Sequence, residues 1–506
     1  MKKKPKLFRR RKNKDQPADI CIICEGSYPY YLGGVAAWVH QLIEEHAERT
    51  FHILTLMPPH PDLTFKYQFP KNVIGHTVLI VQDLPKGSFP FRTPKQTWDI
   101  VGSTLEGLIT SKMFEDFDPL LDFFKKHRKI LGKRILSDST KAWDFFIDFY
   151  NRNIPSGPFK AYFGTVYTLT RSLFSMLLPE LPPAKLYHSV CTGYAGFLLH
   201  RAKKELGVPC ILTEHGIYTN ERRIEIAMAD WVADLTSLNL ALEDKKATLK
   251  DFWLNYFFSL AHVCYMSADQ VISTFEGFQE LQLEGGTDTA KLRTIPHGVK
   301  LDKLKEIKKV RHPPTAAFIG RVVPIKDIKT FIHACHVVKQ KLPDTRFLLL
   351  GPTDEDPNYV EECQKLIDSL GMSNDLQFTG SIEVEDYLSQ IDVLVLTSIS
   401  EAQPLVILEL GAYGIPCVAT NVGECKNLIE GTSKESSPLG PGGIVTPLVN
   451  PEATAKAIIR LLTDDDFYKK CSKAIEKRIK TYYRFDVQHD QYRELYQTLM
   501  QEPIGN

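Results

Sequence analysis

The chain has 506 residues, of which 43% are hydrophobic, and a formal net charge of +1 at pH 7. This composition excludes a mainly disordered chain, and at roughly 150 residues per domain the length predicts about two to four domains. The near-zero net charge lacks the basic excess typical of nucleic-acid-binding proteins, so we expect no nucleic-acid partner.

The N-terminal segment MKKKPKLFRRRKNK is strongly basic, with nine Lys and Arg residues and no acidic residue. Two interpretations of residues 1–17 stay open: a solvated, disordered tail, or an anchor to anionic lipid, to which each basic residue contributes on the order of 1 kcal/mol. A signal peptide is not expected, because no apolar region follows the charges. The sequence has no apolar run of about 18 residues, so we expect a cytoplasmic protein, peripheral to the inner face of the cell membrane if the tail is an anchor.

The ten cysteines are scattered along the chain, which is not the pattern of a disulfide framework. Cys21 and Cys24 form a C-x-x-C pair, but they lie in DICIICE, which is typical of a strand. A redox C-x-x-C lies at a helix N-terminus, where the thiolate is stabilised. We therefore predict that both cysteines are core residues and that the compartment is a reducing cytoplasm.

The first half of the chain begins with a short apolar run, a loop that contains Gly33 and Gly34, and a helical stripe of apolar residues. Strand, glycine turn and helix form the opening unit of a doubly wound domain. A helical insertion is predicted at about residues 85–183, where aromatic-rich helical stretches follow one another without strands, and a long helical region at about 225–265. Further short apolar runs predict strands at residues 51–56, 76–84, 184–190, 209–216, 270–275 and 291–299.

The second half alternates strands and helices again. Strands are predicted at residues 315–321, 346–352, 376–380, 393–398, 416–420 and 442–446. Alternation in both halves predicts two α/β domains, each with a parallel sheet. We expect an N-terminal domain at 18–300, a C-terminal domain at 301–480, and a helix at 481–506 that crosses back to the N-terminal domain.

Polar residues at strand ends are the candidates for a ligand site, because doubly wound domains bind ligands at the C-terminal ends of their strands. Gly33 and Gly34 open the first helix, where backbone N–H groups can approach an anion closely. His215 ends a predicted strand and would point toward the same cleft. Both features have ordinary explanations: a Gly-Gly pair is more often only a turn, and a lone loop histidine is usually structural.

Arg321 and Lys326 lie five residues apart in GRVVPIKD, the loop that follows the strand AAFI. They suit a diphosphate, since the guanidinium supplies a fork of donors and the ammonium a point charge. A pair of solvated surface cations is the alternative, and without further context it is slightly favoured.

Glu401 and Glu409 stand in the stretch SISEAQPLVILELGAYGIPCVAT, which is otherwise largely apolar. A proline suits the first turn of a helix, so we expect a helix from Pro404 whose first turn faces the ligand with unsatisfied N–H groups. Glu409 would lie on this apolar helix, where a buried carboxylate needs partners such as the two hydroxyls of a ribose. Glu401 is closer to the strand tip, where a sugar would follow the phosphates. The candidate binding positions of the first turn are Gln403, Pro404, Leu405 and Val406.

Several motifs together resemble the retaining GT-B glycosyltransferases of family 4, over about residues 19–500. SEAQPLVILE resembles their E-x7-E motif, GRVVPIKD their G-R-x4-K diphosphate loop, GGVAAWVHQLI their first strand-to-helix turn, and GGIVTPLVNPEATAKAI a segment near their C-terminus. In the first half, CEGSYPYYLGGVAAWVHQLI, CTGYAG and TEHGIYTNERRIEI are similar to the PelF subgroup, soluble glycosyltransferases of Pel exopolysaccharide synthesis.

The resemblance implies a GT-B fold: two Rossmann-like domains that face each other across a cleft, with the nucleotide sugar on the C-terminal domain. Arg321 and Lys326 would neutralise the diphosphate leaving group in place of a metal. Glu401 would contact the donor sugar and Glu409 would hold the ribose. The anomeric configuration would be retained, by a front-face route without an obligatory enzyme nucleophile.

On the N-terminal side, the resemblance implies that Gly33 and Gly34 meet the phosphates or the sugar. His215 would contact the sugar near the reacting carbon. Arg222 and Arg223 are further candidates for the acceptor side. One position departs from the family pattern: many relatives have Asn before Gly in the hinge IPHGV, where this chain has a histidine, and we expect a small effect on the interdomain turn.

The implied donor is a UDP-sugar, with UDP-glucose the usual donor of the subgroup, and no metal or other cofactor is expected. The implied partners are a growing exopolysaccharide of the biofilm matrix and the inner-membrane Pel synthesis proteins. Two alternatives stay open: a scaffold that binds nucleotide sugar without catalysis, and a GT-B epimerase that acts on UDP-sugars. The complete motif set argues against the scaffold, which has no need of Glu401.

Overall fold

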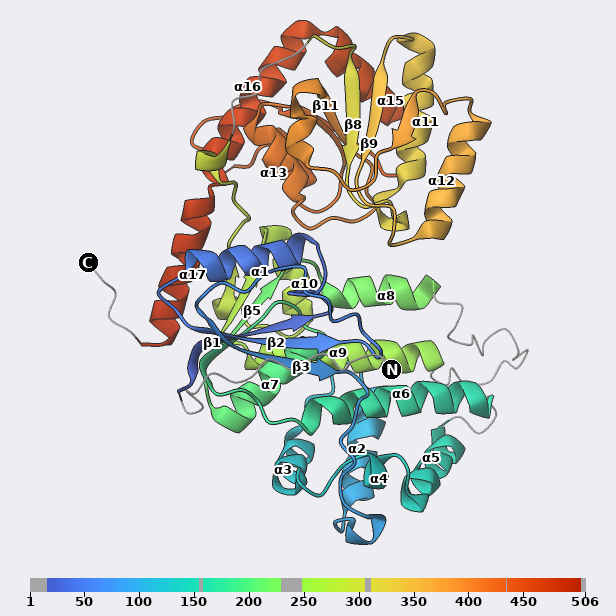
Figure 1. Ribbon diagram of the computed structural model, residues 1–506, viewed down its shortest axis with the longest axis vertical. Coiled ribbons are helices and arrows are strands. Elements are labelled where there is room, and N and C mark those ends of the chain that lie inside the picture. The colour runs from blue at the N-terminus through green and yellow to red at the C-terminus, as the bar shows by residue number, and fades with distance from the viewer. Residues whose placement is uncertain (1–15, 154–157, 229–247, 305–310, 434, 502–506) are drawn as a thin grey trace. The chain divides into compact units, whose positions relative to one another are not determined.

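The computed structural model describes residues 16–153, 158–228, 248–304, 311–433 and 435–501 (Figure 1). Residues 1–15, which include the basic segment, lie outside the described residues. By its internal contacts the chain divides into two compact units: unit 1 holds Met1–Ser273, Phe278–Arg293 and Arg493–Asn506, and unit 2 holds Thr274–Gly277 and Thr294–Tyr492. The domain boundaries expected from the sequence stay predictions, because this division reports contacts alone.

Unit 1 is built on a seven-stranded sheet with the strand order β3-β2-β1-β4-β5-β6-β7. The order reverses between β1 and β4, and both neighbours of β1 run parallel to it, as in a doubly wound domain. Interior strands of such sheets are covered on both faces, which is why β1 reads as a nearly continuous apolar run and not as an alternation. The strands are β1 (Ala18–Glu25), β2 (Phe51–Met57), β3 (Val73–Ile80), β4 (Ala184–Ser189), β5 (Cys210–Glu214), β6 (Gln270–Ser273) and β7 (Leu292–Thr294).

The C-x-x-C pair lies in the middle of β1, as the sequence predicts. Cys21 and Cys24 are fully buried, and burial raises the pKa of both thiols, that of Cys24 to about 12. All ten cysteines are free thiols. A thiol with a raised pKa in the core is a packing residue, so the prediction that this pair is structural is confirmed.

Helices account for the predicted insertion between β3 and β4, and no strand occurs there among the described residues. In Figure 1 these helices gather at the lower end of unit 1, while α1 lies on the opposite side of the sheet. The region predicted as helical at about 225–265 contains parts of α8 and α9; its residues 229–247 lie outside the described residues. The helices of unit 1 are α1 (Gly34–Glu45), α2 (Thr97–Thr110), α3 (Asp118–His127), α4 (Lys133–Leu136), α5 (Thr140–Asn153), α6 (Phe159–Leu177), α7 (Tyr194–Leu206), α8 (Tyr218–Met228), α9 (Leu249–Ser267) and α10 (Gln279–Glu284), with short 3-10 turns at Pro90–Arg92 and Thr289–Lys291. A further 3-10 turn, Glu276–Phe278, spans a boundary between the two units.

Unit 2 has a six-stranded sheet with the order β10-β9-β8-β11-β12-β13, the same order as the first six strands of unit 1. It reverses between β8 and β11, which pair in parallel. Figure 1 shows α11, α12 and α15 on one side of these strands and α13 and α16 on the other. The strands are β8 (Thr315–Ile319), β9 (Arg346–Leu350), β10 (Leu376–Phe378), β11 (Val393–Leu396), β12 (Cys417–Thr420) and β13 (Gly443–Thr446).

The helices of unit 2 follow the strands in the alternation predicted from the sequence. They are α11 (Ile328–Lys341), α12 (Pro357–Ser369), α13 (Leu405–Ala412), α14 (Cys425–Glu430), α15 (Pro451–Thr463), α16 (Asp465–Tyr482) and α17 (Phe485–Leu499), with 3-10 turns at Leu301–Lys303, Pro324–Lys326, Val384–Asp386 and Leu388–Gln390. The division between the units falls within α17. None of the helices in the described part of the chain is long and apolar enough to span a membrane.

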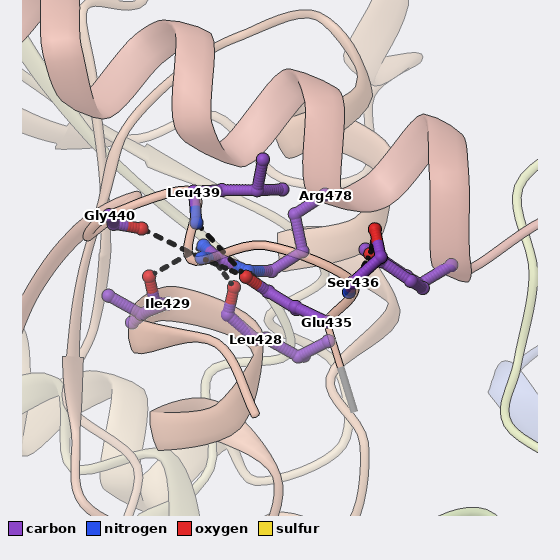
Figure 2. Close-up of polar contacts among 8 residues, drawn as sticks. Leu428, Ile429, Glu435, Ser436, Leu439, Gly440 and Arg478 are labelled. Carbon is purple, nitrogen blue, oxygen red and sulfur yellow. Dashed lines mark hydrogen bonds and ion pairs between the residues drawn. The ribbon is translucent and has the colours of Figure 1, made fainter. Parts of the chain in front are cut away.

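Arg478 of α16 is almost fully buried and fastens the segment between α14 and β13 (Figure 2). Its guanidinium pairs with the Glu435 carboxylate and donates hydrogen bonds to the carbonyl oxygens of Ile429, at 2.8 Å, and Gly440, at 2.7 Å. A buried arginine is tolerated where its charge and its donors are satisfied. This cluster therefore fixes the path of the chain into β13.

The hinge sequence IPHGV packs against the start of α17, within unit 2. The Gly298 amide donates to the Gln488 side chain at 3.0 Å, and a Cβ at this position would lie 2.3 Å from the Arg484 carbonyl carbon. His297 is buried, its amide donates to the Gln403 side chain at 2.6 Å, and burial lowers the pKa of its ring to about 4. The histidine is thus a packed, neutral part of the turn.

Candidate active site

Two predicted site residues meet where the strand order of unit 2 reverses. Lys326 follows β8 and Glu401 follows β11, the two neighbouring strands at the reversal. The Lys326 ammonium Nζ lies 2.5 Å from Glu401 Oε1. Ligands of doubly wound sheets bind at the C-terminal ends of the strands beside such a reversal. The structure therefore brings the predicted diphosphate cation and the predicted sugar carboxylate together at the expected place.

The Lys326–Glu401 ion pair is largely shielded from water. The two side chains are 19% and 11% exposed, and the Ser398 hydroxyl donates to the same Glu401 oxygen at 2.6 Å. Charges in such a place interact more strongly than charges in bulk water, and they need well-aligned partners. An incoming anion would therefore meet a positioned ammonium group and not a freely rotating surface lysine.

Hydrogen bonds tie the loop after β8 to the loop after β11. The Ile399 amide donates to the Ile325 carbonyl at 2.9 Å, and the buried Thr397 hydroxyl donates to the Asp327 carbonyl at 2.8 Å. Asp327 has a positive φ of 45° and caps α11, where its carboxylate accepts from the Thr330 amide at 3.2 Å. These bonds hold the backbone of both charged residues.

Gly423 provides the close approach that completes the Glu401 loop. Its φ is +50°, and a Cβ there would lie 2.1 Å from the Glu401 carbonyl oxygen and 2.4 Å from that of Ala402. The amide of the next residue, Glu424, donates to the Ala402 carbonyl at 2.8 Å. Any side chain at residue 423 would push the Glu401 loop away, so glycine is required there.

Arg321 is not part of the ion pair in this structure. Its guanidinium Nη1 lies 2.6 and 2.7 Å from the two carboxylate oxygens of Glu355. Both side chains are about half exposed, at 49% and 51%, and an exposed pair of this kind is weak. Arg321 is thus held by a contact that an anion of higher charge can replace.

The first turn of α13 differs in two respects from the prediction. Pro404 is the residue before the helix, with extended backbone angles, and the helix begins at Leu405. Since proline has no N–H group, the donors here are those of Leu405 and Val406. Gln403 is buried, and its side-chain oxygen is occupied by the His297 amide, so it is a structural residue of the hinge as well as a site candidate.

Glu409 corrects an expectation, since it is exposed and not buried. The neighbouring residues of α13 are buried, so Glu409 stands on the solvent side of an apolar helix. The surrounding protein nonetheless raises the pKa of its carboxyl, chiefly by desolvation and secondarily through the Glu385 charge. The carboxylate is accessible to a ligand, which its proposed role requires.

In unit 1, the predicted residues lie at the ends of β1 and β5. Gly33 and Gly34 are exposed at the start of α1, and apart from its chain neighbours no described residue lies within 4 Å of a Cβ built at Gly33. His215 follows β5 and packs edge-on against Trp38 of α1, with ring centroids 4.5 Å apart. α1 therefore connects the glycine turn to His215.

Glu25, which the sequence-based search missed, occupies the corresponding reversal point of unit 1. This last residue of β1 accepts a hydrogen bond from the Ala195 amide at the start of α7, at 3.1 Å, and another from the Tyr218 hydroxyl, at 2.8 Å. A helix N-terminus at this point is where a phosphate binds in many doubly wound domains. Because Glu25 fills that position, unit 2 is better suited to a diphosphate than unit 1.

Glu214, the residue before His215, is a second missed carboxyl. It is fully buried and accepts hydrogen bonds from Tyr265 at 2.7 Å, Gln282 at 2.9 Å and Thr192 at 3.4 Å. Burial raises its pKa to about 7, against the effect of these donors. The sequence signal was present, since Glu214 lies in the strand-end stretch TEHG, but a charged residue there is usually expected to face solvent.

No group of three or more His, Cys, Asp or Glu side chains suited to a metal ion occurs within the described ranges. Independence from metal and cofactors stays a prediction.

Arg222, one of the two further candidates for the acceptor side, is half-buried, and its guanidinium stacks over the Tyr218 ring at 5.0 Å. Arg223 is exposed.

A family described as a domain of unknown function, DUF3492, matches residues 18–290, more than half of the chain. The chain belongs to this family. A second family, glycosyl transferases group 1, matches residues 300–478, which include the Lys326–Glu401 pair. The protein is thus a group 1 glycosyltransferase with a DUF3492 domain.

Curated relatives of this glycosyltransferase are also sugar-transferring enzymes. The Escherichia coli UDP-Gal:alpha-D-GlcNAc-diphosphoundecaprenol alpha-1,3-galactosyltransferase is 26% identical over 349 residues, 64% of this chain and 78% of that protein. The D-inositol 3-phosphate glycosyltransferase of Streptomyces bingchenggensis is 27% identical over 223 residues, 40% of this chain. That alignment spans only 47% of the Streptomyces protein.

Solved structures support the fold of the glycosyltransferase. Sucrose-phosphate synthase from Thermosynechococcus elongatus superposes with a TM-score of 0.57 and 17% identity over 96% of this chain and 99% of that chain. HepE of Anabaena in complex with UDP gives a TM-score of 0.59 and 14% identity over 95% and 100%. Together with the two Rossmann-like sheets, these similarities confirm the GT-B fold class.

Proposed function

We propose that this glycosyltransferase moves a hexose from a UDP-sugar to a growing polysaccharide, with retention of the anomeric configuration. The observation that carries the proposal is the shielded Lys326–Glu401 pair at the strand reversal of unit 2. It offers a fixed cation for a diphosphate beside a carboxylate for sugar hydroxyls. The names of the E. coli galactosyltransferase and of the HepE complex, which mention UDP-Gal and UDP, support a uridine nucleotide.

In the proposed reaction, the bond between the anomeric carbon and the β-phosphate oxygen breaks, and the acceptor oxygen forms a bond to that carbon on the same face. The acceptor proton passes to the departing diphosphate. Lys326, joined by Arg321 once it leaves Glu355, stabilises the negative charge that develops on the diphosphate. No enzyme nucleophile is required on this route.

The remaining site residues bind and orient the donor. Glu409, exposed on α13, accepts from the ribose hydroxyls, and the N–H groups at the start of α13 face the phosphates or the sugar. On unit 1, His215 is steadied by Trp38 and would contact the donor sugar. The turn at Gly33 and Gly34 is exposed, and the open space at Gly33 leaves room for a ligand close to the backbone.

The finer assignment follows the resemblance to the PelF subgroup. It makes UDP-glucose the donor, a Pel-type exopolysaccharide of the biofilm matrix the product, and the inner-membrane Pel synthesis proteins the partners. The reaction would take place in the cytoplasm, where UDP-sugars are made.

The direct test is release of UDP from UDP-glucose, UDP-galactose and UDP-N-acetylglucosamine by the purified protein, in the presence of a chelator. Hydrolysis without acceptor is the minimal signal, and we expect it to be largest with UDP-glucose. Glu401→Gln should abolish it, whereas Glu362→Gln, which changes an exposed glutamate of the same unit, should not.

Each alternative function gives a different result. A UDP-sugar epimerase would convert the donor to its epimer without acceptor and without release of UDP. A scaffold would bind UDP-sugar without turnover, and cells that carry Lys326→Ala and Glu401→Ala would still make the full amount of polymer. Absence of both turnover and UDP binding would reject the proposed function.

A further inference from the structure

Two phenylalanines stand in solvent on the loop between β3 and α2. Phe89 is 56% exposed and Phe91 is 81% exposed, the largest value among the big hydrophobic residues of the described chain. Their rings are nearly parallel, 8° apart, with centroids separated by 5.9 Å. Single exposed apolar residues are ordinary on protein surfaces, but a stacked aromatic pair on a projecting loop is a feature to explain.

The loop is held firmly in place. Its Ser88 amide donates to the Ile130 carbonyl at 2.8 Å, and the Lys133 amide donates to the Pro85 carbonyl at 2.7 Å. At Gly87, whose φ is +67°, a Cβ would lie 2.7 Å from the Gly132 Cα, so the two backbones touch. Figure 1 shows this loop at the lower end of unit 1, beside α4. The backbone that carries the two phenylalanines is therefore fixed by these contacts.

An arginine lies against each of the two rings. The Arg134 guanidinium lies 4.6 Å from the centre of the Phe89 ring and that of Arg92 lies 5.8 Å from the centre of the Phe91 ring. Residues 84–98 and 123–137 contain no acidic residue. No carboxylate in the described part of the chain forms an ion pair with Lys86, Arg92, Lys95 or Arg134, whereas nearby Arg128 and Lys133 pair with Glu205 and Asp138.

We propose that this surface, residues 85–95 with Lys133 and Arg134, docks the protein on an anionic lipid bilayer. Aromatic side chains partition into the interface between headgroups and acyl chains, and Lys and Arg beside them contact lipid phosphates. Lipid phosphate is the occupant that the charges favour, because four of the basic residues named above form no ion pair with a carboxylate in the described part of the chain. The proposal is independent of the N-terminal segment and of the sugar transferred.

Co-sedimentation of the full chain with vesicles tests the proposal. Vesicles of phosphatidylcholine alone are compared with vesicles of phosphatidylcholine mixed with phosphatidylglycerol. We expect binding to the anionic vesicles, a loss of about tenfold or more in the partition coefficient for the double variant Phe89→Ser/Phe91→Ser, and a similar loss for Arg92→Gln/Lys95→Gln. The matched control Ile74→Ser changes an exposed apolar residue of β3 in the same unit and should bind as the native chain does.

Because the altered side chains are exposed, the variants should keep the native thermal unfolding midpoint and the native rate of UDP release. A chain that lacks residues 1–14 distinguishes the contribution of the basic N-terminal segment from that of the proposed surface. In this truncated chain, Phe89→Ser/Phe91→Ser should still lower vesicle binding. Failure of the native chain to bind anionic vesicles would overturn the proposal. Equal vesicle binding by the native chain and the phenylalanine variant would also overturn it. If that variant bound vesicles normally but no longer bound a protein partner, the surface would be a protein interface.

Discussion

Lys326 and Glu401 are 75 residues apart in the chain, yet their side chains share one hydrogen bond at the strand reversal of unit 2. Neither residue is unusual by itself. The two form a candidate site because neighbouring strands bring their side chains together. Three tests at the scale of single residues follow from these contacts and from those of Glu355 and Glu214.

Removal of the ammonium group should affect the reaction far more than removal of a neighbouring one. We expect Lys326→Ala to lower kcat/KM for the UDP-sugar by at least about 10²-fold, because a single charge-stabilising group contributes on that scale. Lys329→Ala is the control, since Lys329 lies three residues further on, in the first turn of α11, has a side chain that is 43% exposed, and pairs with Glu362. A change below about threefold in Lys326→Ala would mean that the diphosphate is held elsewhere.

Glu355 should compete with the diphosphate for Arg321. Replacement by glutamine removes the competing charge at similar size, so we expect Glu355→Gln to bind UDP about two- to fivefold more tightly, the range set by a half-exposed pair. Titration calorimetry measures the change in Kd, and it should vanish in the Arg321→Ala background. Weaker UDP binding in Glu355→Gln would show instead that the glutamate orients Arg321 for its ligand.

Glu214 should make the stability of unit 1 depend on pH. Its folded pKa of about 7 lies above the ordinary 4.5, so the protonated carboxyl stabilises the fold fully below about pH 4.5. That contribution, about 3 kcal/mol, is lost as the pH rises through about 7. The free energy of unfolding of Glu214→Gln relative to the native chain should therefore increase by about this amount from pH 4.5 to pH 8 in urea titrations. A constant difference would contradict the burial of an ionisable group here.

At the scale of elements, the loops after β8, β11 and β12 act together. The loop after β11 carries Glu401, the loop after β8 carries Lys326, and Gly423 after β12 lets the backbones approach. In unit 1 the corresponding end of β1 carries Glu25, whose carboxylate accepts a hydrogen bond from the Ala195 amide at the N-terminus of α7. Two sheets of one topology thus have different chemistry at their strand ends.

Gly423→Ala should displace the Glu401 loop, since the added Cβ would meet two backbone oxygens. We expect at least about a tenfold fall in kcat/KM for the UDP-sugar, because small misplacements of site residues are costly. The control is Gly371→Ala: its φ, +68°, is also positive, but there is open space around the Cβ, so this variant reports the backbone strain alone. Equal activity of the two variants would mean that the loop does not depend on this contact.

At the scale of the whole molecule, the alternation of apolar runs predicted the strands of both sheets and the helical insertion, because buried parallel strands are short and continuous in the sequence. The two halves of the ion pair were likewise found from strand ends and motif spacing. The exposure of Glu409 was not predictable, because α13 is apolar on nearly all sides and its pattern does not mark a solvent face.

The sequence does not predict the partner of Arg321. The Arg321–Glu355 pair joins exposed side chains 34 residues apart, and no local pattern selects that partner. Glu25, in contrast, is the last residue of β1, so the strand-end rule points to it as well.

The central claim is that unit 2 binds the diphosphate of a uridine nucleotide at Lys326. The measurement that tests it most directly is titration calorimetry of the native protein and of Lys326→Ala with UDP, GDP and ADP, in the presence of a chelator. The account predicts tight binding of UDP, weaker binding of GDP and ADP, and a large loss of UDP affinity in Lys326→Ala. Equal affinity for the three nucleotides, a requirement for divalent metal, or unchanged UDP affinity in Lys326→Ala would contradict it.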